Sequence, residues 1–248
     1  MDINFLKNRR TIRKYSDKNI SDELLNELLE AAFRVSTTGN MQVYSVVITR
    51  DEANKKKLAP AHFNQPTITT APVVLTFCAD FNRFIKWCEC RNASPGYDNF
   101  QSFFTASIDA LLAAQQFCTA AEAKGLGICY LGTTTYNAGQ IIEALDLPRF
   151  VVPITTITVG YPEFIPEQVE RLPLEAIIHQ EKYHDYTAAD IDRLYKEKED
   201  LPCNKGFVAE NGKETLAQVF TDIRYPRNNN EHFSDVFIQV IKEQGFKF

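Results

Sequence analysis

The sequence has no long hydrophobic run. No window of its 248 residues approaches the length of a membrane-spanning helix. Residues 1–10 also lack an apolar stretch between a basic start and a small-residue cleavage site, which is the pattern of a secretory signal. We therefore expect a cytoplasmic protein with no membrane partner.

Groups that could bind a metal are scarce. The chain has six cysteines and four histidines, and the histidines show no ligand spacing. Cys88 and Cys90 are separated by one residue, which is closer than the usual pair of zinc ligands, and no second pair follows. Cys78, Cys118 and Cys129 lie in apolar segments, where small buried thiols are common in cytosolic proteins. The sequence predicts no metal site.

An excess of positive charge is absent as well. The formal net charge is −5, and its long-range field repels a polyanion. This argues against bulk binding to nucleic acid or to an acidic membrane. Hydrophobic residues make up 44% and charged residues 24%, as in ordinary globular proteins, and no stretch has the composition of a domain linker. We expect one compact body with a C-terminal extension.

The positive charge that the chain does have is concentrated near its start, in residues 9–15, here called the arginine segment. Four of these seven residues are Arg or Lys. Such a cluster can be a solvated face, an arm for nucleic acid or a site for a small anion. Arg9 and Arg13 suit a phosphate because a guanidinium group donates two parallel hydrogen bonds, whereas Lys14 is a point charge.

Hydrophobic spacing predicts helices and strands in alternation. Ser21 can cap a helix whose apolar residues recur on one stripe up to Phe33. Residues 103–121 are apolar almost all round, which indicates a central helix or a dimer interface. The other expected elements are helices over 5–9, 53–62, 140–145, 191–198 and 231–244, strands over 44–49, 73–79, 127–133 and 152–160, and loops over 91–99 and 201–213.

Four more motifs accompany the arginine segment. They are a Thr-x-x-Asn-x-Gln loop at residues 37–42, Gln65 ahead of a strand, Gly132-Thr133 after another strand, and Arg171-Leu172-Pro173. Their order resembles the flavin-dependent nitroreductase family, in its larger branch with a long C-terminal tail. The resemblance implies an α+β fold in three layers, α/β/α, with a central mixed, mostly antiparallel sheet. It also implies an FMN-binding core over residues 1–174, and a helical extension over 175–248 that wraps the partner in a homodimer.

The same resemblance implies how FMN is held. The arginine segment binds the phosphate and ribityl chain, the loop at residues 37–42 lies against the isoalloxazine, and Arg171 returns to the phosphate. Relatives have Gly-Gly where this chain has Gly132-Thr133, and some have Lys where it has Val169. The implied cofactor-binding residues are Arg9, Arg10, Thr11, Arg13, Thr37, Asn40, Gln65, Leu131, Gly132, Thr133 and Arg171.

The implied reaction belongs to the flavin. NAD(P)H gives a hydride to FMN, and a nitroaromatic, a quinone or a free flavin then takes its place and is reduced. No side chain is expected to act as a catalytic acid or base. One alternative is a non-catalytic flavin- or nucleotide-binding regulatory protein on the same fold, which the departures at Thr133 and Val169 favour. A nucleic-acid-binding module conflicts with the net charge and lacks a groove-reading motif.

Two lysines in the C-terminal extension suggest which hydride donor the protein prefers. Lys205 and Lys213 bracket a polar, glycine-bearing stretch in the region where NADPH-preferring relatives place a basic residue against the 2′-phosphate. We expect a modest preference for NADPH over NADH. The alternative is that these lysines only make a loop soluble.

Overall fold

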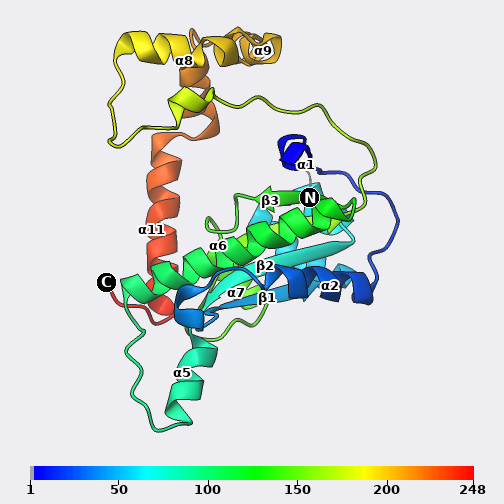
Figure 1. The fold of residues 1–248 in the computed structure, drawn as a ribbon, viewed down its shortest axis with the longest axis vertical. Coiled ribbons are helices and arrows are strands. Elements are labelled where there is room, and N and C mark those ends of the chain that lie inside the picture. Colours follow the sequence, from blue (N-terminus) through cyan, green and yellow to red (C-terminus); the bar gives the residue numbers. More distant parts are fainter. Residues whose placement is uncertain (1–2) are drawn as a thin grey trace. The chain divides into compact units, whose positions relative to one another are not determined.

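The computed structural model describes residues 3–248, which form two compact units (Figure 1). The first unit comprises the chain up to Glu167 together with residues 233–248, and the second is 168–232. The expected boundary after residue 174 lies close to this division, whereas the last 16 residues belong to the first unit. No helix among the described residues is long and apolar enough to span a bilayer.

The helices follow the expected order along the chain. The first unit contains α1 (Ile3–Lys7), α2 (Asp22–Ala32), α3 (Glu52–Leu58), α4 (Pro66–Thr70), α5 (Asn82–Glu89), α6 (Phe100–Ala123) and α7 (Ala138–Ala144). The second contains α8 (Ala188–Asp200), α9 (Pro202–Glu210) and α10 (Leu216–Gln218), and the division between the units falls within α11 (Arg227–Glu243). Short 3₁₀ helices lie at η1 (Thr38–Asn40), η2 (Ala59–His62) and η3 (Leu174–Ala176), and η4 (Val219–Arg224) is a short π-helix.

Four described strands form one sheet in the first unit. They are β1 (Tyr44–Thr49), β2 (Val73–Asp80), β3 (Gly127–Leu131) and β4 (Val151–Gly160), in the order β1-β2-β4-β3. Every neighbouring pair is antiparallel, so the mixed pairing expected from the sequence does not occur among these strands. Every residue of β2 is buried. A strand that is buried on both faces has a continuous run of apolar residues, and this run made the position of β2 predictable from the sequence.

Helices cover both faces of the sheet, which confirms the three-layer α+β architecture. Alternate side chains of β2 point to opposite faces. Leu75 and Phe77 pack in one core with α2 and α6, and Figure 1 shows α6 lying across this face. Val74 packs in a second core with residues from α3, α4 and α7, among them Leu58 and Ile141.

Helix α6 has two different apolar faces. Its inward face is made largely of alanines with Phe103 and Phe117, and it is buried. Asn99 caps its first turn, where its side chain accepts a hydrogen bond from the Ser102 amide at 3.0 Å. The outward face carries large hydrophobic side chains at helical spacing that are 41–50% exposed. They are Phe100, Phe104, Ile108, Leu111 and Leu112.

Three elements differ from the sequence prediction. Helix α5 begins directly after β2, where only the end of a strand was expected, because the Asp80 carboxylate accepts a hydrogen bond from the Arg83 amide at 3.2 Å. Helix α4 lies in the segment expected as an extended lead-in. Helix α9 replaces most of the expected loop over 201–213, since Pro202 is favourable at its first position and Asn204 donates to the Lys198 carbonyl at 2.7 Å.

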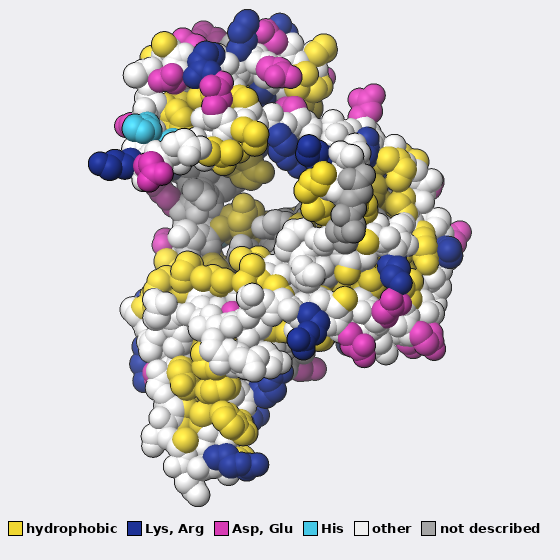
Figure 2. Space-filling model, in the orientation of Figure 1, with side chains coloured by type: hydrophobic (Ala, Val, Ile, Leu, Met, Phe, Trp, Pro, Cys, Tyr) yellow, Lys and Arg dark blue, Asp and Glu magenta, His cyan; other side chains and the backbone are white. Residues whose placement is uncertain are grey.

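Helix α5 carries an exposed tryptophan that packs against half-buried aromatic side chains. Trp87 is 56% exposed, and its ring centroid lies 5.3 Å from that of Phe84, which also contacts Tyr97. Figure 2 shows hydrophobic side chains gathered over this helix. The adjoining residues 91–99 have no helix or extended strand, as the sequence predicts.

Candidate functional site

The arginine segment lies along the sheet as an extended chain. The Ile12 amide donates to the Ile128 carbonyl at 3.0 Å, and the Ser16 amide donates to the Tyr161 carbonyl at 2.9 Å. Two glycines make this close approach possible. A Cβ on Gly127 would overlap Ile12, and a Cβ on Gly160 would lie 2.7 Å from the Tyr15 ring. The sheet therefore positions the backbone that carries the arginines.

Tyr15 anchors the end of the segment. Its hydroxyl lies 2.7 Å from the Thr158 hydroxyl and donates to the Thr158 or Ile12 carbonyl, while the Thr67 hydroxyl lies 3.0 Å from that of Thr158. Burial raises the pKa of Tyr15 well above its ordinary value. Tyr15 therefore stays protonated at neutral pH, and its phenol joins α4, β4 and the arginine segment.

A pocket of about 690 Å³ opens beside this anchor. Arg13 and Tyr15 from the arginine segment line it together with Gln65 and Thr67. The structure thus brings together two predicted site residues that are 52 positions apart. Burial raises the pKa of the Cys129 thiol, and the nearby positive charge of Arg13 opposes that rise.

Arg9 and Arg10 line a second, smaller pocket of about 230 Å³. The Arg9 guanidinium is paired with Glu122, with its Nη2 3.1 Å from Oε1. The Arg10 Nε is buried and has no hydrogen-bond partner among the described residues. A buried guanidinium nitrogen without a partner is costly, so this atom suits an anionic ligand. Thr11, also predicted for the site, is half-buried.

The loop at residues 37–42 has an unusual backbone. Gly39, Asn40 and Gln42 all have φ between 54° and 56°, the left-handed region that costs energy for residues other than glycine. Thr37 is half-buried and Asn40 is exposed. Arg83 donates to the Gln42 carbonyl, which ties the loop to the start of α5. Contacts with the surrounding structure thus support this backbone conformation of the loop.

Asp109 supports this loop, and it was not predicted from the sequence. It is fully buried in α6, and its Oδ1 accepts hydrogen bonds from the Thr38 amide at 3.0 Å and from the Thr38 hydroxyl at 3.2 Å. The sequence does contain one signal for it. Asp109 is the single carboxylate among the mostly small and apolar residues on the inward face of α6. A buried charge needs such partners, so Asp109 and the loop depend on each other.

Replacing Asp109 with alanine should lower the free energy of unfolding by about 2 kcal/mol, because the Thr38 amide loses a charged acceptor. Asp109→Asn keeps one oxygen acceptor and should lose roughly half as much. Chemical denaturation measures both changes, and limited proteolysis should cut the loop faster in the alanine variant. Equal stability of the two variants would contradict the role assigned to the carboxylate.

The end of β3 and the turn after it contain three predicted residues. Leu131 is buried, Gly132 is exposed, and no atom lies within 4 Å of the position of a Cβ on Gly132. Thr133 is half-buried, and its hydroxyl lies 2.8 Å from Nδ1 of His62. The Asn137 amide donates to the Ala61 carbonyl at 3.0 Å, so two contacts join this turn to η2. The turn is fixed in place and faces open space at Gly132.

His62 was also missed by sequence reasoning, which found only that the histidines lack ligand spacing. Its side chain is 0% exposed. Burial lowers its pKa to about 4, so the ring is neutral at physiological pH. Its Nε2 has no hydrogen-bond partner in the described part of the chain.

The remaining predicted residues lie in the second unit. Arg171 donates to the Val169 and Glu170 carbonyls at 3.4 and 2.8 Å, and its contact with a phosphate stays a prediction. Lys205 is 2.9 Å from Asp200 and Lys213 is 2.8 Å from Asp222.

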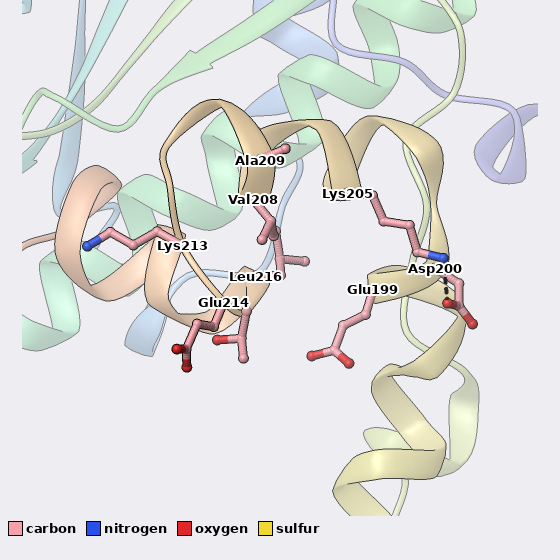
Figure 3. A pocket seen from close by; sticks show the side chains of 9 residues that line it. Glu199, Asp200, Lys205, Val208, Ala209, Lys213, Glu214 and Leu216 are labelled. Carbon is pink, nitrogen blue, oxygen red and sulfur yellow. Dashed lines mark ion pairs between the residues drawn. The ribbon is translucent and has the colours of Figure 1, made fainter.

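Both lysines line one pocket of about 440 Å³, together with Glu199 and Glu214. Figure 3 shows the two lysine side chains reaching away from each other toward opposite ends of this pocket. Each ammonium group already has a carboxylate partner, and the glutamates add negative charge. This setting is less favourable to a 2′-phosphate than the free cationic loop expected from the sequence, and the role of both lysines stays a prediction.

No group of three or more His, Cys, Asp or Glu side chains between residues 3 and 248 is placed to hold a metal ion. All six cysteines are free thiols. Burial raises the pKa of Cys78 and Cys118, so neither is a reactive thiolate at neutral pH.

Comparison with known proteins connects this geometry to a family. The model described as "Nitroreductase family" matches residues 6–161. The FMN reductase [NAD(P)H] of Bacillus subtilis (strain 168) is 32% identical over 255 aligned residues, which span 99% of this chain and 97% of that protein. A solved structure from Bacteroides fragilis NCTC 9343, described as an oxidoreductase, is 62% identical with a TM-score of 0.98 and covers 99% of this chain and 100% of its own.

A more distant solved structure is informative because of its ligand. The NADPH:FMN oxidoreductase of Vibrio harveyi, complexed with NAD⁺, has a TM-score of 0.75 and 25% identity, and the match covers 88% of this chain and 94% of that one. The family model alone spans more than half of the chain, and the resemblance seen in the sequence is confirmed. The chain belongs to the nitroreductase family.

Proposed function

We propose that this chain is an FMN-dependent NAD(P)H oxidoreductase that reduces nitroaromatics, quinones or flavins by ping-pong hydride transfer. Bound FMN would supply the hydride chemistry. One observation carries the proposal. Arg13 and Gln65 line the same pocket of about 690 Å³, in a chain that belongs to the nitroreductase family. The relatives named above as reductases support catalysis and give no support to a non-catalytic regulator.

The residues present fit FMN. Arg10 and Arg13 supply positive charge along one extended backbone, whereas the charge of Arg9 is already balanced by Glu122. The unpartnered Nε of Arg10 is a donor suited to a phosphate oxygen. The open space at Gly132 lets backbone amides approach a flat ring without a side chain in the way.

The chain's own side chains would bind and orient, and none would serve as a catalytic acid or base. Tyr15 has a raised pKa and His62 a lowered one, so neither exchanges a proton readily at neutral pH. The loop at residues 37–42 would place Thr37 and Asn40 against the flavin. Chemistry that resides in the cofactor needs no such side chain.

The active unit would be a homodimer in the cytoplasm. The exposed apolar stripe on α6, from Phe100 to Leu112, supports a partner copy because large exposed apolar patches mark interaction sites. Six free thiols agree with a reducing compartment. Any preference for NADPH through Lys205 or Lys213 would be modest, because contact with the 2′-phosphate competes with exposed ion pairs worth about 1 kcal/mol or less.

The proposal is tested with purified protein. We expect FMN to be released on denaturation, and NAD(P)H to be oxidised when menadione or nitrofurazone is the acceptor. Arg13→Ala should weaken FMN binding about tenfold, or 1.4 kcal/mol, in a fluorescence titration, since a hydrogen bond to a charged group is lost. Lys56→Ala, at an exposed position on α3, is the charge-matched control and should bind as the parent does. Protein that cannot be reconstituted with FMN, or that oxidises no NAD(P)H with either acceptor, would contradict the proposal.

A further inference from the structure

The contact between His62 and Thr133 has a preferred direction. A neutral imidazole has one N–H donor and one acceptor nitrogen. Nδ1 lies 2.8 Å from the Thr133 hydroxyl, while Nε2 is buried and has no partner in the described structure. An unpaired buried N–H is rarer in proteins than an unpaired acceptor. The ring therefore carries its proton on Nδ1 and donates it to the Thr133 oxygen.

This direction determines what the hydroxyl of Thr133 can do. Its oxygen accepts from His62, so its own proton is free to be donated to another group. Thr133 is half-buried, and it follows Gly132, which faces open space. The contact between Asn137 and the Ala61 carbonyl, at 3.0 Å, holds the same two segments together and limits their movement.

We propose that His62 is a positioning residue that fixes the Thr133 hydroxyl as a hydrogen-bond donor to bound FMN, and so makes the flavin easier to reduce. This inference rests on the proposed function and on the family resemblance, which implies that Gly132 and Thr133 bind FMN. Two-electron reduction adds negative charge to the flavin ring, and a donor fixed in advance stabilises that charge more than it stabilises the oxidised ring. A histidine that was charged would also donate from Nδ1, but full burial keeps this one neutral.

The test compares the affinities of the protein for oxidised and reduced FMN. Thr133→Val removes the hydroxyl, and His62→Leu removes the group that orients it. Each should lower the affinity for reduced FMN about tenfold relative to oxidised FMN, which makes the two-electron midpoint potential about 30 mV more negative. A redox titration against a reference dye measures the potential, and fluorescence titration measures the affinity for oxidised FMN.

Two conservative variants act as controls. Thr133→Ser keeps a hydroxyl, and His62→Asn keeps an amide donor near the position of Nδ1, so both should have a potential close to that of the parent. Because the two residues act as a unit, His62→Leu combined with Thr133→Val should shift the potential no more than either change alone. If His62→Leu fails to fold, Thr133→Val against Thr133→Ser tests the donor, and His62→Asn against the parent tests its orientation.

Several results would overturn the inference. A variant Thr133→Val with the potential of the parent would show that the hydroxyl does not reach the flavin. A loss of stability in His62→Leu with no change of potential would assign His62 a structural role only, and additive shifts in the double variant would show that the residues act separately. A parent that binds no FMN would overturn the proposed function as well, whereas a parent with tightly bound FMN and unshifted variants would overturn this inference alone.

Discussion

Replacing Gly160 with alanine should lower the free energy of unfolding by about 3 kcal/mol. A Cβ at this position would lie 2.7 and 2.8 Å from two carbons of the Tyr15 ring and 2.8 Å from Cδ of Pro72. Neither neighbour is the end of a flexible chain, since one is an aromatic ring held by hydrogen bonds and the other is a proline. Overpacking of this kind forces shifts of the backbone, with costs of roughly 1–3 kcal/mol or more.

The same change should weaken FMN binding, because Tyr15 ends the arginine segment and a displaced ring moves its backbone. Chemical denaturation and a fluorescence titration with FMN measure the two effects. Gly139→Ala is the matched control, since its Cβ would lie 3.6 Å from Val240 in ordinary contact and alanine favours a helix. A Gly160→Ala variant as stable as the Gly139→Ala variant would show that the segment does not need this close approach.

The second large effect is a loss of stability in acid that is caused by His62. Burial lowers its pKa from 6.5 to about 4 in the folded protein. Above pH 6.5 the ring is neutral in both the folded and the unfolded state, so stability is unaffected. As the pH falls from 6.5 toward 4, the unfolded state binds a proton that the folded state refuses, and stability decreases. The shift corresponds to about 3 kcal/mol near pH 4 and about 2 kcal/mol at pH 5.

The measurement is denaturant unfolding at pH 7 and pH 5 for the parent and for His62→Leu, which cannot titrate. The parent should lose about 2 kcal/mol more than the variant between these two pH values. Replacing the exposed His184 with glutamine controls for general effects of losing a histidine, and this variant should follow the parent. Identical pH dependence in the parent and in His62→Leu would mean that the buried ring accepts a proton as easily as a free one.

Local patterns in the sequence were sufficient to predict most of the helices and strands of the first unit. Strand β1 has the predicted bounds, Tyr44–Thr49, because a short β-rich run between turn signals needs little context. Helix α2 begins after Ser21 as predicted, where the serine side chain accepts from the Leu24 amide at 3.2 Å. The order of motifs was sufficient to indicate the family. Helix α9 was missed because Gly206 lies within it and its stabilising contact, from Asn204 to Lys198, reaches across to α8.

Only the tertiary structure decided which side chains support the site. Asp109 binds Thr38 and His62 binds Thr133, and in each pair the partners are 71 residues apart. A sequence pattern reports propensity and periodicity over neighbouring residues, and neither reveals a partner so far along the chain. Burial decides the chemistry of His62, since the same histidine exposed to water would titrate near neutrality. The sequence thus determined the elements and the residue types of the site, whereas packing determined the hydrogen-bond partners of its side chains and the charge of His62.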